Sequence, residues 1–118
     1  MEKFVMQALL YDFYGELLTK HQQNIYEDAV LNDMSLSEIA EEQGISRQGV
    51  HDIVKRCNKI LNGYEEKLHL IEKFLKTKEM VKEIQQCATF AGREQDPEEV
   101  RLHLKKIADI SNEILEEY

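Results

Sequence analysis

The chain has few of the residues that interrupt helices. Its 118 residues include one proline and five glycines, whereas leucine, isoleucine, glutamate, lysine and glutamine are abundant. β-Branched residues are scattered, and no stretch alternates strictly between apolar and polar residues over the length of a strand. These absences argue against a sheet protein and predict an all-α fold.

Residues that cross-link a chain or hold metals and nucleotides are also scarce. The two cysteines, Cys57 and Cys87, form no Cys-x-x-Cys pair, and the four histidines show no zinc-ligand spacing. We interpret both cysteines as buried, reduced thiols. There is no GxxxxGK[ST] or GxGxxG loop to hold phosphates. We therefore expect no metal, no cofactor and no enzymatic activity.

Long apolar runs are absent as well. The first one is broken by Gln7 and Asp12, so it is too short and too interrupted for a signal peptide or a membrane span. The sequence predicts a protein that stays in the cytoplasm and does not enter a membrane.

Positive charge is scarce except in one segment. The chain has a net charge of −8, and residues 1–45 alone carry two lysines against nine acidic residues. Within Ser46–Asn62 the balance reverses, because this segment has four basic residues and only one acidic residue, Asp52. An acidic chain binds nucleic acid weakly without sequence preference, since phosphate neutralisation supplies most of that affinity. One basic helix on an acidic body could still bind DNA locally.

The segment Leu36–Lys55 has the spacing of a helix-turn-helix motif. Ser35 and Glu38 form a capping box at the start of the first helix, and Gly44 is suited to the left-handed turn that ends it. Ser46 caps the second helix. Packing two helices steeply through a short turn requires a small residue and apolar partners facing inward, which are supplied by Ala40, Ile39, Ile45, Val50 and Ile53.

If Val50 points inward, the helical repeat places a polar set of residues outward. In a DNA-binding protein, Arg47 could bond guanine, Gln48 could bond adenine, and Lys55 and Lys59 could contact phosphates. Asp52 fits this interpretation less well, because it repels phosphates, and an ordinary solvated helix face remains an alternative. The candidate nucleic-acid-binding residues are Ser46, Arg47, Gln48, His51, Lys55 and Lys59. For His51 a simple surface role is the stronger alternative.

Apolar periodicity divides the chain into a tri-helical helix-turn-helix head, residues 1–62, and a C-terminal helical hairpin, residues 63–118. In the first helix one face carries Phe4, Val5, Ala8, Leu9 and Phe13. A heptad-like seam runs through Cys57, Leu61, Tyr64, Leu68, Ile71 and Leu75, and a second stripe runs from Val100 to Ile114. The apolar surface left after the last helix folds back predicts a homodimer. The alternative is a monomer whose C-terminal helices cover the N-terminal ones.

Two segments resemble known proteins. Leu18-Thr-Lys-His-Gln22 followed by Ser35-Leu-Ser-Glu-Ile-Ala-Glu-Glu-Gln-Gly-Ile-Ser-Arg-Gln-Gly-Val-His-Asp52 resembles the fourth region of bacterial sigma factors, which places a helix-turn-helix on promoter DNA. Together with Tyr14-Gly-Glu-Leu-Leu-Thr-Lys20 and Tyr64-Glu-Glu-Lys-Leu68, the chain is more similar to the YlxM family of small Gram-positive proteins. That resemblance implies a regulatory part in the signal recognition particle pathway. The other sigma-factor regions are lacking, so we do not expect an initiation factor.

Two hypotheses of function follow from these observations. The first is a regulatory DNA-binding protein, and the second is an accessory protein that binds the signal recognition particle, its RNA or its GTPase, without DNA. The acidic body favours the second, because it suits a basic protein surface and opposes a long DNA footprint.

Overall fold

The computed structural model describes all 118 residues, and every element in it is helical. This confirms the all-α class and the helix-turn-helix head with a C-terminal helical extension. No helix is long and apolar enough to cross a membrane. The elements are α1 (Lys3–Tyr14), the 3-10 helix η1 (Gly15–Leu17), α2 (Lys20–Tyr26), the π-helix η2 (Glu27–Leu31), α3 (Leu36–Gln43), α4 (Arg47–Leu68), α5 (Leu70–Arg93) and α6 (Pro97–Glu117).

The chain forms two compact units, Met1–Ile71 and Glu72–Tyr118. The division expected after Asn62 falls inside α4, which continues through Asn62 and Gly63 to Leu68. A glycine inside a helix costs only about 1 kcal/mol relative to alanine. The buried side chain of Leu61 anchors the helix just before this step, so the helix is not interrupted there.

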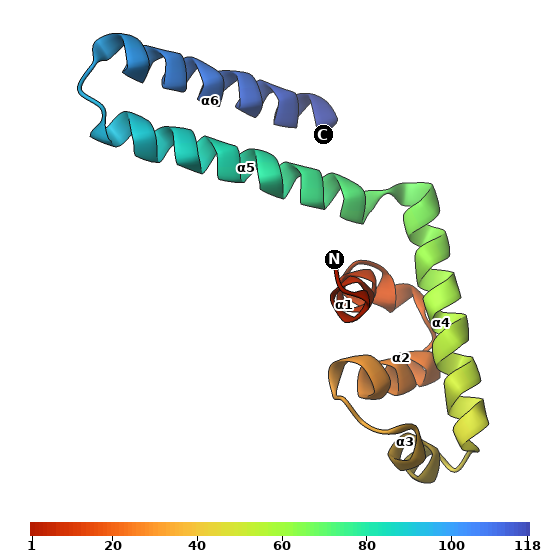
Figure 1. Cartoon of the computed structure of the whole chain (residues 1–118). Helices are drawn as coiled ribbons and strands as arrows, with labels where there is room; N and C mark the ends of the chain where they lie inside the picture. The colour runs from red at the N-terminus through yellow and green to blue at the C-terminus, as the bar shows by residue number, and fades with distance from the viewer. The chain divides into compact units, whose positions relative to one another are not determined.

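The helix-turn-helix forms as its local sequence signals predict. Ser35 and Glu38 make both hydrogen bonds of the capping box, and Gly44 adopts the left-handed conformation with φ 68°. Helices α2, α3 and α4 pack around a core of Ile25, Ile39, Ala40 and Val50 (Figure 1). Of the inward positions that the sequence predicts, Ile39 and Val50 are fully buried and Ala40 is nearly so.

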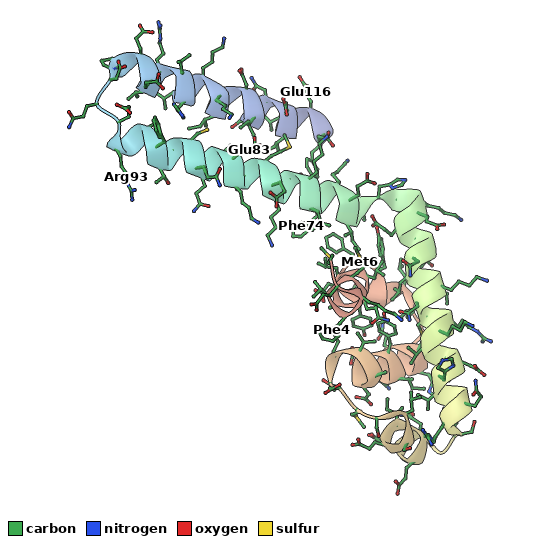
Figure 2. All side chains as sticks on the ribbon, viewed as in Figure 1. Phe4, Met6, Phe74, Glu83, Arg93 and Glu116 are labelled. Carbon is green, nitrogen blue, oxygen red and sulfur yellow. The ribbon has the colours of Figure 1, made fainter.

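Helix α1 turns a different face inward from the one expected. Leu10 and Tyr14 are buried, whereas Phe4 is 57% exposed. Phe4 is labelled on α1 in Figure 2. Tyr14 can be buried because its hydroxyl donates to Glu65 Oε1 at 2.6 Å and its ring stacks on Tyr64. Apolar periodicity misses such a position, because it does not count a tyrosine that finds a polar partner inside the fold.

The heptad-like seam is not continuous. Helix α4 ends at His69, which takes the left-handed conformation with φ 54°. Cys57, Leu61 and Ile71 are all buried in the first unit, so they are used within one chain and are not available to a partner. Two hydrogen bonds hold the turn: Glu65 Oε1 accepts from the amide of Ile71 at 2.9 Å, and the Tyr14 hydroxyl accepts from that of Leu70 at 3.3 Å.

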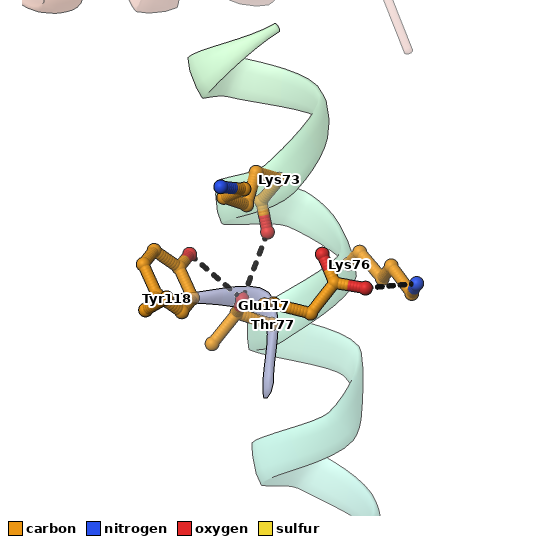
Figure 3. Close-up of polar contacts among 5 residues, drawn as sticks. All are labelled: Lys73, Lys76, Thr77, Glu117 and Tyr118. Carbon is orange, nitrogen blue, oxygen red and sulfur yellow. Dashed lines mark hydrogen bonds and ion pairs between the residues drawn. The ribbon is translucent and has the colours of Figure 1, made fainter. Parts of the chain in front are cut away.

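The second unit is an antiparallel pair formed by α5 and α6 (Figure 1). At one end the imidazole of His103 stacks on Phe90, with ring centroids 4.1 Å apart. At the other end Lys76 Nζ donates to Glu117 Oε1 at 2.7 Å, and the hydroxyls of Thr77 and Tyr118 lie 2.9 Å apart (Figure 3). Polar and aromatic contacts therefore join the two helices at both ends.

Candidate nucleic-acid interface

The start of α4 is a capped helix end on the surface of the head. Ser46 Oγ accepts a hydrogen bond from the amide of Gly49 at 2.9 Å. A Cβ atom at residue 49 would lie 3.1 Å from Ser46 Oγ, which is a tight contact. The glycine is thus explained by the cap itself. Ser46 Oγ already accepts this one bond, and its hydroxyl hydrogen remains available to donate to a further partner.

Three of the predicted residues line one surface hollow. Arg47, Gln48 and His51 surround it together with Leu36 of α3, and its volume is about 390 Å³. All three side chains are exposed. Leu36, in the first helix of the helix-turn-helix, therefore lies beside the first turns of the second helix.

An acidic residue occupies the centre of this face. Gln48 Nε2 donates to Asp52 Oδ1 at 2.9 Å, and His51 Nδ1 lies 3.7 Å from the same oxygen. The amide nitrogen of Gln48 is thus already bound within the chain. To bond an adenine through both its amide atoms, Gln48 must first release Asp52.

Lys55 and Lys59 follow one and two turns further along α4. Both are exposed, and neither shares an ion pair with an acidic side chain; the same holds for Arg47. Their charges are therefore not neutralised within the chain. Since α4 contains these three cations and the cap of Ser46, one helix carries all six candidate residues.

The structure also places residues here that sequence reasoning missed. Lys3 and Gln7 of α1 lie beside His51, Lys55 and Asn58 of α4 around a second hollow of about 390 Å³. Nothing in the local sequence signals this neighbourhood, because Lys3 is far from α4 along the chain and only the packing of α1 on α4 brings them together.

Known proteins share the sequence that forms this helix-turn-helix. The profile of the family described as "Putative helix-turn-helix protein, YlxM / p13 like" matches residues 1–101. The chain belongs to this family. It is 43% identical to a UPF0122 protein of Thermoanaerobacter sp. over 98% of this chain and 96% of that relative. It is 42% identical to the UPF0122 protein YlxM of Bacillus subtilis over 81% of this chain and 87% of that relative. A UPF0122 protein of Caldanaerobacter subterraneus is 48% identical over 73% of this chain and 74% of that relative.

Proposed function

We propose that this member of the family is a regulatory protein that binds DNA with the outward face of α4. The observation that carries the proposal is the set of cations on that face, Arg47, Lys55 and Lys59, exposed and without acidic partners. They sit on the second helix of a helix-turn-helix, the element that enters the major groove in proteins of this kind. The proposal also places the protein in the cytoplasm, where bacterial DNA lies.

The residues divide into two roles along α4. Arg47 and Gln48, in the first turn, are placed to contact base edges, and guanine is the usual partner of an arginine there. Lys55 and Lys59 lie further from the capped end and suit phosphates, as does the hydroxyl proton of Ser46. Gln48 donates a hydrogen bond to Asp52. A DNA base that binds Gln48 must therefore form hydrogen bonds that compensate for the loss of this one. His51 borders both hollows.

Substitutions at Arg47 and Lys55 separate these roles. On a DNA site selected from a genomic library, Arg47→Ala should cost about 1–3 kcal/mol of binding free energy and relax the preference at one base pair. Lys55→Ala should weaken all sequences alike and make the negative slope of log K against log salt shallower by about 0.9, because one phosphate contact is lost. Mobility shifts at several salt concentrations measure both effects. If the unmodified protein retains no fragment even at low salt, it is not a DNA-binding protein.

A second candidate is an accessory role in the signal recognition particle pathway, without DNA. What favours it is the charge of the first 45 residues, where nine acidic residues stand against two lysines. Such a surface suits a basic partner and repels DNA. Binding assays with the purified particle, its RNA and its GTPase, run beside the DNA selection, distinguish the two candidates. Retention of the particle alone would favour the second.

The proposed active form is a homodimer held by the second unit. Exposed apolar side chains recur at heptad spacing on α5, at Val81 and Ala88. On α6, Leu104, Ala108 and Leu115 form a similar exposed stripe. Because the two helices are antiparallel, the helical repeat places both stripes on the same side of the hairpin. A two-helix hairpin cannot cover that side by itself, whereas a second copy can, and a dimer would present two copies of α4 to two half-sites.

The mass in solution tests this proposal. Sedimentation equilibrium at micromolar concentration should give twice the chain mass of 13.9 kDa. Leu104→Lys should reduce the mass to that of one chain while helicity persists, because it puts a charge on the proposed interface. Leu102→Lys is the matched control, since Leu102 is as exposed as Leu104, 56% against 55%, but lies on another side of α6. A mass of one chain for the unmodified protein contradicts the dimer.

A further inference from the structure

A groove runs between the start of α1 and the middle of α4. The hollow lined by Lys3, Gln7, His51, Val54, Lys55 and Asn58 forms one part of it. An adjoining hollow of about 560 Å³ shares Lys3, Gln7 and Asn58 and continues to Asn62. Since His51 also borders the hollow beside Arg47 and Gln48, this groove is continuous with the proposed DNA-binding face.

The floor of the groove is a side-chain amide whose orientation is fixed from below. Tyr26, which is fully buried, donates its hydroxyl hydrogen to Asn58 Oδ1 at 2.6 Å. Gln7 Nε2 donates to the same oxygen at 3.3 Å. Because both bonds occupy the oxygen, the amide nitrogen of Asn58, with its two N–H donors, is the group left for an occupant of the groove.

The groove therefore combines two exposed cations with a neutral donor whose orientation is fixed. Lys3 comes from α1 and Lys55 from α4, both are exposed, and neither has an ion-pair partner. No acidic residue lines either hollow. Cationic side chains beside amide N–H donors make a set that suits an anion with several acceptor oxygens, such as a phosphate.

We infer that this groove binds a backbone phosphate of the DNA contacted by α4, held by Lys3, Lys55 and the Asn58 amide. The inference rests on the proposed function and extends it, since it makes α1 a part of the interface. Helix α1 then fixes the register of α4 on the duplex, because a phosphate contact from a separate element restrains how α4 can tilt in the groove.

The test uses the full chain and the DNA site selected by the unmodified protein. Ethylation interference should reveal a phosphate whose modification blocks binding, and Lys3→Ala should abolish that interference at the same position. Lys3→Ala should also make the negative slope of log K against log salt shallower by about 0.9. Asn58→Asp keeps an oxygen that can accept from Tyr26 and Gln7 but replaces the amide N–H donors by a negatively charged oxygen. It should therefore weaken DNA binding more than Lys3→Ala does. Lys20→Ala removes an exposed lysine of α2 outside both hollows and should change neither measurement.

The outcomes separate this inference from the proposed function. If the unmodified protein binds DNA and Arg47→Ala weakens it, but Lys3→Ala leaves the salt slope and the interference pattern unchanged, α1 does not contact the backbone and the inference is wrong. If Lys20→Ala makes the salt slope as much shallower as Lys3→Ala does, the effect comes from the overall charge. That result would also contradict the inference that the groove binds a phosphate. If the unmodified protein binds no DNA, the proposed function fails and the inference with it.

Discussion

The helix-turn-helix head should unfold cooperatively as the pH rises from 10 towards 12. Burial raises the pKa of Tyr14 to about 12, helped by its hydrogen bond to the Glu65 carboxylate. Burial likewise raises the pKa of Tyr26 to about 12, and burial together with the bond to Glu27 raises the pKa of Tyr11 even more. Above pH 10 the unfolded chain therefore loses three phenolic protons that the folded head retains.

The sign follows from which state holds the protons. A group with a raised pKa in the folded state contributes stability that is complete below the pKa of the unfolded state, about 10 for tyrosine, and is lost as the pH rises through the pKa of the folded state. With three such groups, the free energy of unfolding should fall by up to about 4 kcal/mol per pH unit. Circular dichroism should change together with the part of the tyrosinate absorbance that comes from these three residues.

Two variants control this prediction. Tyr26→Phe removes one titrating hydroxyl and should reduce the pH slope by about one third, although the loss of the bond to Asn58 also lowers overall stability. Tyr118→Phe removes a tyrosine that is 72% exposed and lies outside the head, so it should leave the slope unchanged. If more than two of the five tyrosines ionise around pH 10 while helicity is complete, at least one of the three hydroxyls is not protected.

Ile39→Ala should lower the free energy of unfolding of the head by about 2–5 kcal/mol. Ile39 is fully buried at the centre of the cluster with Ile25, Ala40 and Val50. Its removal leaves a cavity between rigid helices, which cannot collapse easily because α3 is tied to α4 by a short turn. Urea unfolding followed by tyrosine fluorescence measures this, since the chain has no tryptophan and only Tyr118 of its five tyrosines lies outside the first unit, Met1–Ile71.

Leu17→Ala is the control for this substitution. Leu17 is 56% exposed in the short helix η1, so its truncation removes little buried area and should change the stability of the head by less than about 0.5 kcal/mol. Equal shifts for Ile39→Ala and Leu17→Ala would mean that the core does not centre on Ile39.

The sequence predicts the parts of the fold whose causes are local. The capping box of Ser35 and Glu38, the left-handed Gly44 and the cap of Ser46 each depend on residues within three or four positions of one another, and all of them form. The start of α6 has a local cause too, since Asp96 caps it and Pro97 occupies its first position. Such signals can be found without knowing the tertiary structure.

What sequence patterns miss depends on distant partners. The left-handed His69 has no glycine or proline to signal a helix end, and its turn is held by Tyr14, more than fifty residues earlier. The π-helical turn at Glu27–Leu31 likewise has no local signature. At the candidate interface, the bond between Gln48 and Asp52 joins residues four positions apart, which the helical repeat brings together. The approach of Lys3 to Lys55 depends instead on the packing of α1 against α4.

The turn at His69 also affects how the chain opens. The amides of Leu70 and Ile71 are bound by the Tyr14 hydroxyl and the Glu65 carboxylate, groups that belong to the head although the two amides begin α5. Their hydrogen exchange with solvent requires the head to open at Tyr14, and fraying within α5 alone does not release them. The first turn of α5 therefore shares the local stability of the head, and the boundary between independently opening segments lies inside a helix.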